Sequence, residues 1–293
     1  MAAVPQNMQM GALRTFLAEL EQDRSLEAPD RLRYRIEALD RIDAWLPGMD
    51  STDASLLLRA QAACGRLEAL NARLYQDIRD DIRAGRGAAR MRQWISANPT
   101  GGKQGRRQAG YDHLDELVGG ILQLQEPLPP AIELASEMVF YQPTPARHIF
   151  EMIARCGLDG DDVFIDLGSG MGHVPLLVAL CTSAHAIGIE LEPTYVACAK
   201  QAADALKLTN AGFAQCDARA AEFASGTVFY LYTPFKGAIM REVLDRLQRE
   251  AERRPIRICT FGPCTQVVAN EPWLVTSDAL ETDRLVVFHT PGA

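Results

Sequence analysis

The residues with the clearest capacity for chemistry form a short glycine-rich stretch directly after an apolar run. Residues 163–172 read VFIDLGSGMG. The apolar half predicts a buried strand, and the residues after the last glycine predict a helix. Glycines at such a turn can adopt positive φ, which lets backbone amides approach a bound ligand closely. The stretch therefore predicts a ligand-binding turn of the kind that serves dinucleotides or S-adenosylmethionine.

Carboxylates at the predicted strand ends separate these two ligands. The dinucleotide pattern G-x-G-x-x-G needs a glycine where the chain has His173, and Asp166 stands just before the first glycine. A carboxylate there faces a pyrophosphate badly but suits the ammonium of a methionine moiety. Glu190 ends the second predicted strand, where it can accept hydrogen bonds from a ribose, and Asp217 follows the third strand, beside the expected adenine.

This ordered set favours S-adenosylmethionine as the cofactor. A nicotinamide site and a purely structural turn are the alternatives. The predicted cofactor-binding residues in the set are Asp166, Gly168, Ser169, Gly170, Gly172, Glu190 and Asp217.

The loop after the fourth predicted strand is the expected acceptor site, and residues 230–236 read YLYTPFK. Methyl transfer from a sulfonium is an in-line displacement, so its main requirement is the alignment of acceptor, methyl and sulfur. The loop looks like the [DN]-P-P-[YF] loop of methyltransferases that hold a planar amino group, with Thr233 in place of the Asp or Asn; a plain turn is the alternative. We expect Tyr232, Thr233, Pro234 and Phe235 to line the substrate pocket, with Tyr232 and Thr233 as candidate catalytic residues.

These motifs carry a resemblance to a known family. The segment from Asp166 to Asp217 resembles the class I, seven-β-strand methyltransferases. Within that class, residues 139–180 are most similar to the non-SET histone-lysine methyltransferases that act on the nucleosome core, and to their bacterial relatives. The resemblance implies that the stretch upstream of the first strand closes over the methionine end of the cofactor. Tyr141 and Thr144 would then contact the cofactor, and Tyr141 is also a candidate catalytic residue.

Alternating strand and helix patterns must position these motifs. After residue 130, short apolar runs alternate with helical patterns, which is typical of a parallel sheet covered on both faces. The sequence therefore predicts an α/β fold, a Rossmann-like doubly wound sheet of seven strands whose last strand is antiparallel. The predicted strands are 162–167, 185–190, 211–216, 227–232, 256–261, 274–280 and 284–290, the last two as a closing antiparallel pair.

The residues before the sheet follow a helical pattern instead. Between residues 11 and 85, apolar side chains recur at three- and four-residue steps. We expect this all-helical region to bury its apolar stripe as core, and a homodimer through these helices is the alternative. The stripe on the longest predicted helix consists of Leu67, Leu70, Leu74, Ile78 and Ile82.

Residues 98–110 are basic and rich in glycine, which predicts a mobile loop. The loop is either a linker or a lid over an acidic substrate. A proline-rich break at 126–130 follows it. The predicted domains are therefore a helical region, 1–130, and a methyltransferase domain, 131–293.

The charge balance restricts the partners. The 293 residues include 30 basic and 38 acidic side chains, a formal charge of -8. An acidic chain lacks the attraction to phosphate that drives non-specific nucleic-acid binding, so we expect neither a nucleic acid nor a nucleosome as a partner. The longest apolar stretch is too short to span a bilayer, so we expect no membrane contact.

The cysteines and histidines carry less information. The seven cysteines include no Cys-x-x-Cys pair, which indicates reduced thiols and a cytoplasmic protein. The five histidines are scattered without ligand-like spacing, so we predict no metal site.

The leading hypothesis is an enzyme, an S-adenosylmethionine-dependent methyltransferase that moves a methyl group to an unidentified acceptor by in-line displacement. The acceptor is a protein side chain or a small molecule. The alternative is a non-catalytic S-adenosylmethionine-binding module that acts through its helical region. The sequence leaves open whether the acceptor atom is nitrogen, oxygen, carbon or sulfur, and which residue, if any, is the general base.

Overall fold

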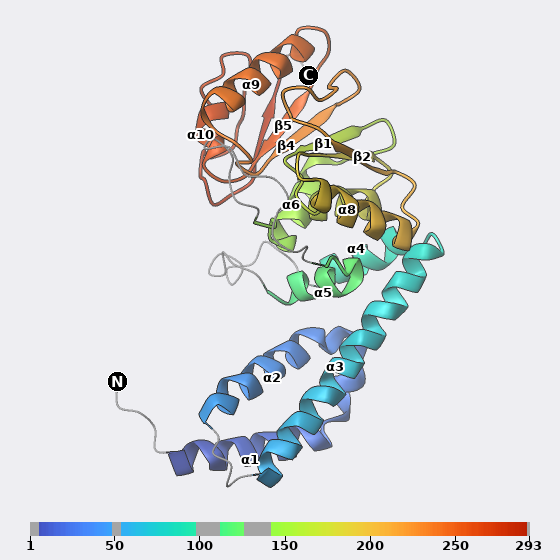
Figure 1. Cartoon of the computed structure of the whole chain (residues 1–293), viewed down its shortest axis with the longest axis vertical. Helices are drawn as coiled ribbons and strands as arrows, with labels where there is room; N and C mark the ends of the chain where they lie inside the picture. Colours follow the sequence, from blue (N-terminus) through green and yellow to red (C-terminus); the bar gives the residue numbers. More distant parts are fainter. Residues whose placement is uncertain (1–5, 49–53, 98–111, 126–141, 292–293) are drawn as a thin grey trace. The chain divides into compact units, whose positions relative to one another are not determined.

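The computed structural model of the protein describes residues 6–48, 54–97, 112–125 and 142–291 (Figure 1). Backbone contacts divide the chain into two compact units, Met1–Ile78 and Arg79–Ala293. The domain boundary expected at residue 130 stays a prediction. The helices between residues 79 and 130 join the second unit because they pack on helices that cover the sheet. The predicted basic loop at 98–110 lies outside the described residues.

The first unit is helical, as the sequence pattern indicates. Its core gathers side chains from all of its helices, including Leu13, Leu17, Ile42, Leu56 and Leu67. Leu67 belongs to the predicted apolar stripe, so this part of the stripe is core. The unit contains α1 (Gln6–Gln22), α2 (Leu32–Trp45) and most of α3 (Ala54–Arg83), with 3-10 turns at Arg24–Glu27, Pro29–Arg31 and Leu46–Gly48.

The second unit is built on a six-stranded sheet in the order β3-β2-β1-β4-β5-β6. Strands β1 to β5 are parallel to one another, and β6 is antiparallel to β5. Each strand falls within one of the predicted apolar runs. The strands are β1 (Val163–Leu167), β2 (His185–Glu190), β3 (Ala211–Gln215), β4 (Val228–Leu231), β5 (Arg257–Thr260) and β6 (Val286–His289).

The seventh strand predicted at residues 274–280 is reduced to a single antiparallel bridge, made by Val275. Beyond the bridge, side chains take the backbone groups of β6 that a neighbouring strand would use. Thr276 Oγ1 donates to the Val287 carbonyl at 2.7 Å, and Val287 N donates to Asp278 Oδ2 at 2.9 Å. In the part of the chain that the structure describes, the sheet therefore has six strands where the sequence predicts seven.

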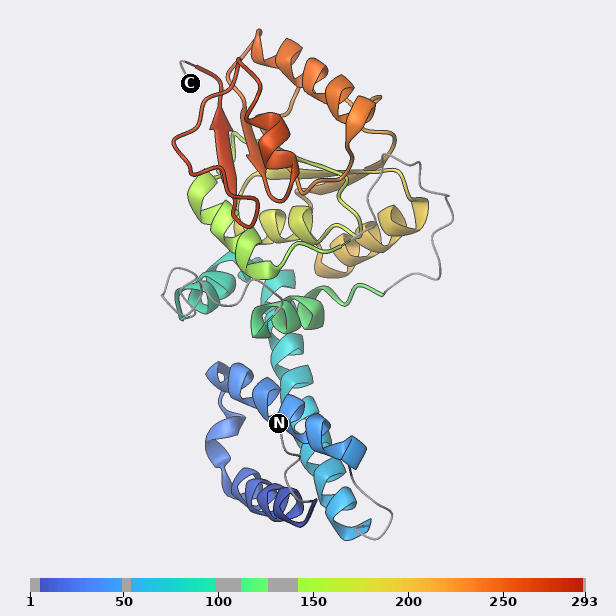
Figure 2. The same cartoon turned by 90° about the vertical axis from the view of Figure 1, so that its left-hand side faces the viewer.

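Helices cover both faces of this sheet. The helices of the second unit are α4 (Gly87–Ala97), α5 (His113–Leu122), α6 (Ala146–Cys156), α7 (His173–Cys181), α8 (Pro193–Leu206), α9 (Gly237–Ala251) and α10 (Cys264–Val268). α9 lies on the opposite face of the sheet from α6 and α8, as Figures 1 and 2 show. α7 packs against α6 and α8, while α4 packs on α7 and α5 packs on α6. None of the described helices combines the length and the apolar character that a membrane span requires.

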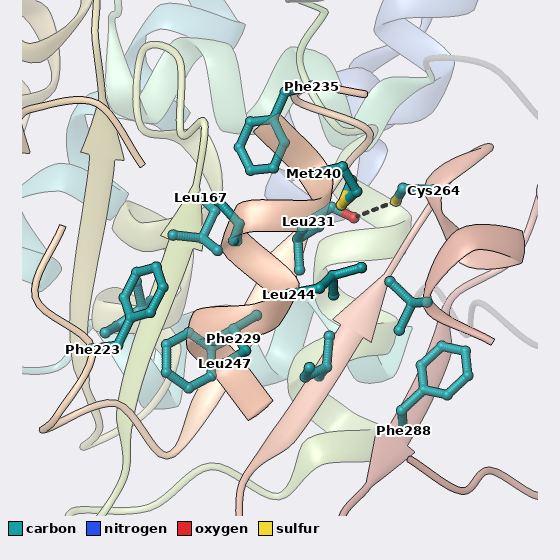
Figure 3. Close-up of a cluster of buried hydrophobic side chains, with 14 of the residues drawn as sticks. Leu167, Phe223, Phe229, Leu231, Phe235, Met240, Leu244, Leu247, Cys264 and Phe288 are labelled. Atoms are coloured by element: carbon teal, nitrogen blue, oxygen red, sulfur yellow. Dashed lines mark hydrogen bonds between the residues drawn. The ribbon is translucent and has the colours of Figure 1, made fainter. Parts of the chain in front are cut away.

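The core between the sheet and α9 holds the ends of the central strands in place. Leu167 on β1 and Leu231 on β4 pack with Met240 and Leu244 of α9 in one buried cluster (Figure 3). The thiol of Cys264 donates to the Leu231 carbonyl at 3.4 Å, which ties the start of α10 to the same strand end. Burial of this apolar surface, at about 25 cal/mol per Å², fixes the strand ends from which the loops of the site begin.

Candidate active site

A cavity of about 320 Å³ opens at the carboxyl ends of the parallel strands. Asp166 comes from β1, Glu190 from β2 and Tyr230 from β4, so three neighbouring strands contribute to its wall. Open α/β sheets bind ligands at this edge. Ten predicted site residues line this one cavity: Thr144, Asp166, Gly168, Ser169, Glu190, Asp217, Tyr232, Thr233, Pro234 and Phe235. Tyr141, the remaining candidate catalytic residue, lies outside the described residues.

The glycine turn serves the cavity and the packing behind it. Gly168, Gly170 and Gly172 all have positive φ, at 81°, 53° and 84°. Gly168 and Ser169 line the cavity, whereas Gly170 and Gly172 lie outside its lining. A Cβ on Gly172 would lie 2.7 Å from the ring of Phe213, so this glycine permits close packing of α7 on the sheet.

Gly168 also allows the loop after β4 to approach the glycine turn. A Cβ at this position would lie 2.3 Å from Cβ of Pro234. The first glycine is therefore required by its contact with the predicted substrate loop, in addition to its positive φ. This contact brings the predicted cofactor turn and the predicted acceptor loop together in one wall.

Asp166 places a buried carboxyl at the cavity. Only 3% of the surface of Asp166 is exposed. Burial raises the pKa of Asp166 well above its ordinary value of 3.8, and the negative charge of Glu190 raises this pKa further. Such a carboxyl gains from the arrival of a cation, because the cation stabilises its ionised form.

Glu190 is fixed by three backbone amides. Its Oε2 accepts from Gly170 N at 2.8 Å, and its Oε1 accepts from Leu191 N at 2.7 Å and Glu192 N at 2.9 Å. Since a carboxylate offers about four acceptor positions, these bonds orient Glu190 and leave acceptor capacity for a ligand.

Asp217 is held in a different way. Its carboxylate accepts three hydrogen bonds from Arg219, one from the backbone amide and two from the guanidinium, at 2.8–3.0 Å. The hydrogen bonds from Arg219 hold the pKa of Asp217 below its ordinary value. The neighbouring Ala218 also lines the cavity. Arg219 thus orients the carboxylate, while the carbonyls of Asp217 and Ala218 accept from Ala220 N and Ala221 N.

A pair of hydroxyls joins the segment before α6 to the sheet. Thr144 Oγ1 and Tyr230 OH lie 3.2 Å apart, and both residues are buried. Tyr230 pairs in register with Asp166 across β4 and β1. Burial raises the pKa of Tyr230 well above 10, so its hydroxyl keeps its proton and can act as a donor. Gln142 and Pro143, next to Thr144, extend this wall of the cavity.

The predicted acceptor loop is an apolar and aromatic part of the wall. Phe235 is buried, and Tyr232 is partly buried with its ring 4.9 Å from that of Phe261. Thr233 has a φ of 43°, which is uncommon outside glycine. Its Oγ1 accepts from Cys264 N at 3.1 Å, so its hydroxyl supports the loop. This contact favours a positioning role for Thr233 over direct participation in proton transfer.

His173 lies at the first position of α7 and also lines the cavity. Burial lowers its pKa from 6.5 to about 4. The imidazole is therefore neutral at physiological pH. Its neutrality fits a position at a helix N-terminus, where the helix dipole disfavours a cation.

Two tyrosines of the wall, Tyr195 and Tyr230, are not among the site residues predicted from the sequence. Tyr230 precedes Tyr232 by two residues, and such residues share one face of a strand. Tyr195 lies in the first turn of α8, directly after the end of β2. The sequence contains both the spacing of Tyr230 from Tyr232 and the position of Tyr195 after β2. Neither feature identifies a wall residue until the structure shows that the strand ends meet.

The charge of the wall tests whether the residues fit the predicted cofactor. Asp166, Glu190, Glu192 and Asp217 line the cavity, and its described lining contains no lysine or arginine. Acidic groups attract a sulfonium and an ammonium and repel a pyrophosphate. Ser169 Oγ is buried in this wall with no hydrogen-bond partner among the described residues. The residues fit S-adenosylmethionine and do not fit a dinucleotide. In the described part of the chain, no cluster of three or more metal-ligating side chains occurs.

The sequence and the structure were compared with known proteins. Residues 134–226 match the family model described as "Histone methylation protein DOT1". No curated protein matches the sequence.

Similar solved structures include an RNA methyltransferase from Salinibacter ruber in complex with S-adenosyl-L-homocysteine, at 25% identity and a TM-score of 0.40, over 51% of this chain and 92% of that chain. A putative methyltransferase, yhhF, from Escherichia coli is similar at 14% identity and a TM-score of 0.41, over 55% and 92%. TrmN from Thermus thermophilus is similar at 16% identity and a TM-score of 0.38, over 48% of both chains.

The family match spans the glycine turn, Glu190 and Asp217, and it extends upstream over Thr144. The same residues surround the acidic cavity, at the carboxyl edge of a sheet whose last strand is antiparallel. The match and this arrangement together identify the chain as a class I S-adenosylmethionine-dependent methyltransferase.

Proposed function

We propose that this chain methylates an acceptor held beside the loop 232–235, with the cofactor held by the acidic part of the same cavity. The observation that carries the proposal is the composition of the wall. Four carboxylates stand on the side of β1, β2 and β3, and the loop after β4 contributes the proline and aromatic side chains Tyr232, Pro234 and Phe235. A cationic cofactor suits the first group, and a partly apolar acceptor suits the second.

Four residues and the backbone at 217–218 have the main binding roles. Asp166 would hold the ammonium of the methionine moiety, because its buried carboxyl gains most from a positive partner. Glu190, oriented by its three amide donors, would accept from the ribose hydroxyls. Gly168 and Ser169 would offer the close approach that the glycine turn provides. Backbone groups at 217–218 would meet the adenine.

The chemistry of transfer requires alignment above all. When bound, S-adenosylmethionine supplies an electrophilic methyl group, and the acceptor lone pair forms the new bond as the carbon–sulfur bond breaks and sulfur keeps the electron pair. Tyr232 and Phe235 would orient the acceptor against the methyl group. Thr233 would hold their loop through Cys264. An acceptor that carries a proton must also lose it. Burial raises the pKa of Tyr232, so its hydroxyl keeps its proton and would orient the acceptor rather than take that proton.

The acceptor class follows from charge. The matching family model is described by histone methylation, but this chain carries a formal charge of -8. A nucleosome presents a dense phosphate surface, which an acidic chain repels. We therefore propose a protein side chain or a small molecule as the acceptor, in the cytoplasm, with the helical region shaping access to it. A homodimer through the helices remains part of this proposal.

Calorimetry with S-adenosyl-L-homocysteine and with NAD tests the cofactor. We expect micromolar binding of the first and none of the second. Asp166→Ala and Glu190→Ala should each weaken binding at least tenfold, since a hydrogen bond to a charged group contributes about 1.5–3 kcal/mol. Near-native affinity in both variants would contradict the site assignment.

Transfer of a labelled methyl group tests the activity. The full chain is incubated with labelled S-adenosylmethionine and with lysate fractions or metabolite pools, and the labelled product is identified. Label on one acceptor supports the proposal. Tight cofactor binding without transfer to any fraction would favour the non-catalytic module instead.

A further inference from the structure

The first turn of α6 begins directly at the wall of the cavity. Gln142, Pro143 and Thr144 line the cavity, and Ala146 is the first residue of the helix. The N-cap residue is Pro145, which makes no side-chain capping bond. The first amides of any helix lack partners within the helix, so this end needs an acceptor from elsewhere.

Asp115 of α5 supplies that acceptor. Its Oδ1 accepts from Ala146 N at 2.7 Å, while its Oδ2 accepts from Asp112 N at 2.7 Å. The second bond belongs to the capping box of α5, in which Asp112 Oδ1 accepts from Leu114 N at 2.8 Å. One carboxylate therefore caps two helices at once.

A second contact joins the same two helix ends. Arg147, in the first turn of α6, donates to Asp112 Oδ2 and forms an ion pair with it. α5 and α6 lie side by side, as Figures 1 and 2 show. The start of α6 is thus held by both acidic residues of the α5 capping box.

The wall segment is also fixed at its other side. Thr144 Oγ1 bonds to Tyr230 OH at 3.2 Å, one residue before Pro145. The segment from Gln142 to Ala146 is therefore attached both to the sheet and to α5. Removing either attachment should loosen this wall without removing any carboxylate that lines the cavity.

We propose that Asp115 is a positioning residue of the methyltransferase site: acting through Ala146, it holds the wall 142–144 in the shape that binds the cofactor. Asp115 precedes the segment that matches the family model, so the site depends on a helix outside that segment. The inference rests on the proposed function, because it assigns the cavity to S-adenosylmethionine. It gives α5 a part in binding, beyond its part in the packing of the second unit.

The other end of α6 offers a matched control. Arg155, in its last turn, donates to Asp278 Oδ2, and the same oxygen accepts from Val287 N at 2.9 Å. Asp278 thus resembles Asp115 in its partners, because each aspartate accepts from a backbone amide outside α6 and from a group of α6. Neither Asp278 nor Arg155 lines the cavity. Removing either aspartate should lower the stability of the protein. Only the removal of Asp115 should weaken cofactor binding.

The experiment measures S-adenosyl-L-homocysteine binding by calorimetry, and thermal unfolding without ligand, on the full chain. Asp115→Ala should raise the Kd about tenfold, the scale expected when a helix cap and a charge-assisted bond are lost. Asp115→Asn, which keeps an oxygen for Ala146 N, should remain within about threefold of the wild type. Asp278→Ala should lower the Tm while leaving the Kd within about twofold. If Asp115→Ala fails to fold, Asp115→Ser is measured in its place. Serine offers one side-chain oxygen where aspartate offers two.

The outcomes separate the two levels of inference. If the wild type binds and Asp115→Ala binds as tightly, the positioning role is wrong and the proposed function stands. If Asp278→Ala weakens binding as much as Asp115→Ala, the effect is general destabilisation and the positioning role is again wrong. If the wild type does not bind S-adenosyl-L-homocysteine, the proposed function fails, and this inference fails with it.

Discussion

Thr233 and Cys264 exchange two hydrogen bonds across the loops that follow β4 and β5. Thr233 N donates to Cys264 Sγ at 3.4 Å, and Cys264 N donates to Thr233 Oγ1 at 3.1 Å. The two bonds therefore join the two loops in one wall, in which Tyr232 and Pro263 line the same cavity. Thr233 is a catalytic candidate from the sequence, but its side-chain hydroxyl accepts the hydrogen bond that joins these loops.

Removing the hydroxyl of Thr233 should destabilise the protein. Thr233→Ala leaves the amide of Cys264 without its acceptor, which should lower the free energy of unfolding by about 1–2 kcal/mol. Thr233→Ser keeps the oxygen and should recover most of the loss. Chemical denaturation of both variants measures the difference. Equal losses in the two variants would show that the methyl group, not the hydroxyl, matters here.

Gly262 should tolerate no side chain. Its φ is 88°, and a Cβ would lie 2.7 Å from Thr233 Oγ1. Gly262→Ala should therefore destabilise the chain by at least about 1 kcal/mol and lower the rate of methyl transfer through the displaced wall.

The matched control for that variant is Gly160→Ala. The nearest atom to a Cβ there is Ser183 Oγ at 3.7 Å, an ordinary contact. This variant should unfold within about 0.5 kcal/mol of the wild type and keep its transfer rate. Comparable losses in the two alanine variants would contradict the steric argument.

Asp166→Asn should stabilise the cofactor-free protein while weakening cofactor binding. The pKa of Asp166 is raised by folding, so the folded state binds more protons than the unfolded state above pH 3.8. The free energy of unfolding then falls as the pH rises from 3.8 towards the raised pKa, and a neutral amide avoids that loss. At pH 7 we expect a gain of about 1 kcal/mol or more, or a few degrees in Tm.

The same substitution removes the charge proposed to hold the cofactor. The Kd for S-adenosyl-L-homocysteine should rise at least tenfold. Thermal unfolding without ligand and calorimetry with it measure the two effects on one sample. A variant that loses both stability and affinity would contradict the prediction.

His173 should make stability depend on pH between 4 and 6.5. Folding lowers its pKa from 6.5 to about 4, so in this range the unfolded state binds more protons and stability rises with pH. The contribution is present above pH 6.5 and is lost as the pH falls to 4, by about 3 kcal/mol at most. Denaturation of the wild type and of His173→Gln across this range measures it. An unchanged slope in the variant would assign the effect to other groups.

Much of the sheet was predictable because parallel strands buried on both faces read as continuous apolar runs. All six strands lie within predicted apolar runs, and β1, β4 and β5 are almost wholly buried, as that pattern requires. The seventh did not follow, because the hydroxyl of Thr276 and the carboxylate of Asp278 compete for the backbone of Val287. That competition depends on which side chains lie opposite β6, and the spacing of apolar residues does not predict such hydrogen bonds.

The acidic side of the cavity was also predictable. Asp166, Glu190 and Asp217 each stand at the end of an apolar run, and parallel strands bring such ends to one edge. Local sequence thus determined the fold class, the cofactor and most of the cavity wall.

Only the tertiary structure decided what holds that wall. The bonds from Asp115 to Ala146, from Thr144 to Tyr230 and between Thr233 and Cys264 join residues 31, 86 and 31 positions apart. No spacing rule relates such pairs, because their distance depends on how α5, α6 and the strands pack. The sequence determined which groups can do chemistry, and packing over long separations determined which of them face the cavity and which support its wall.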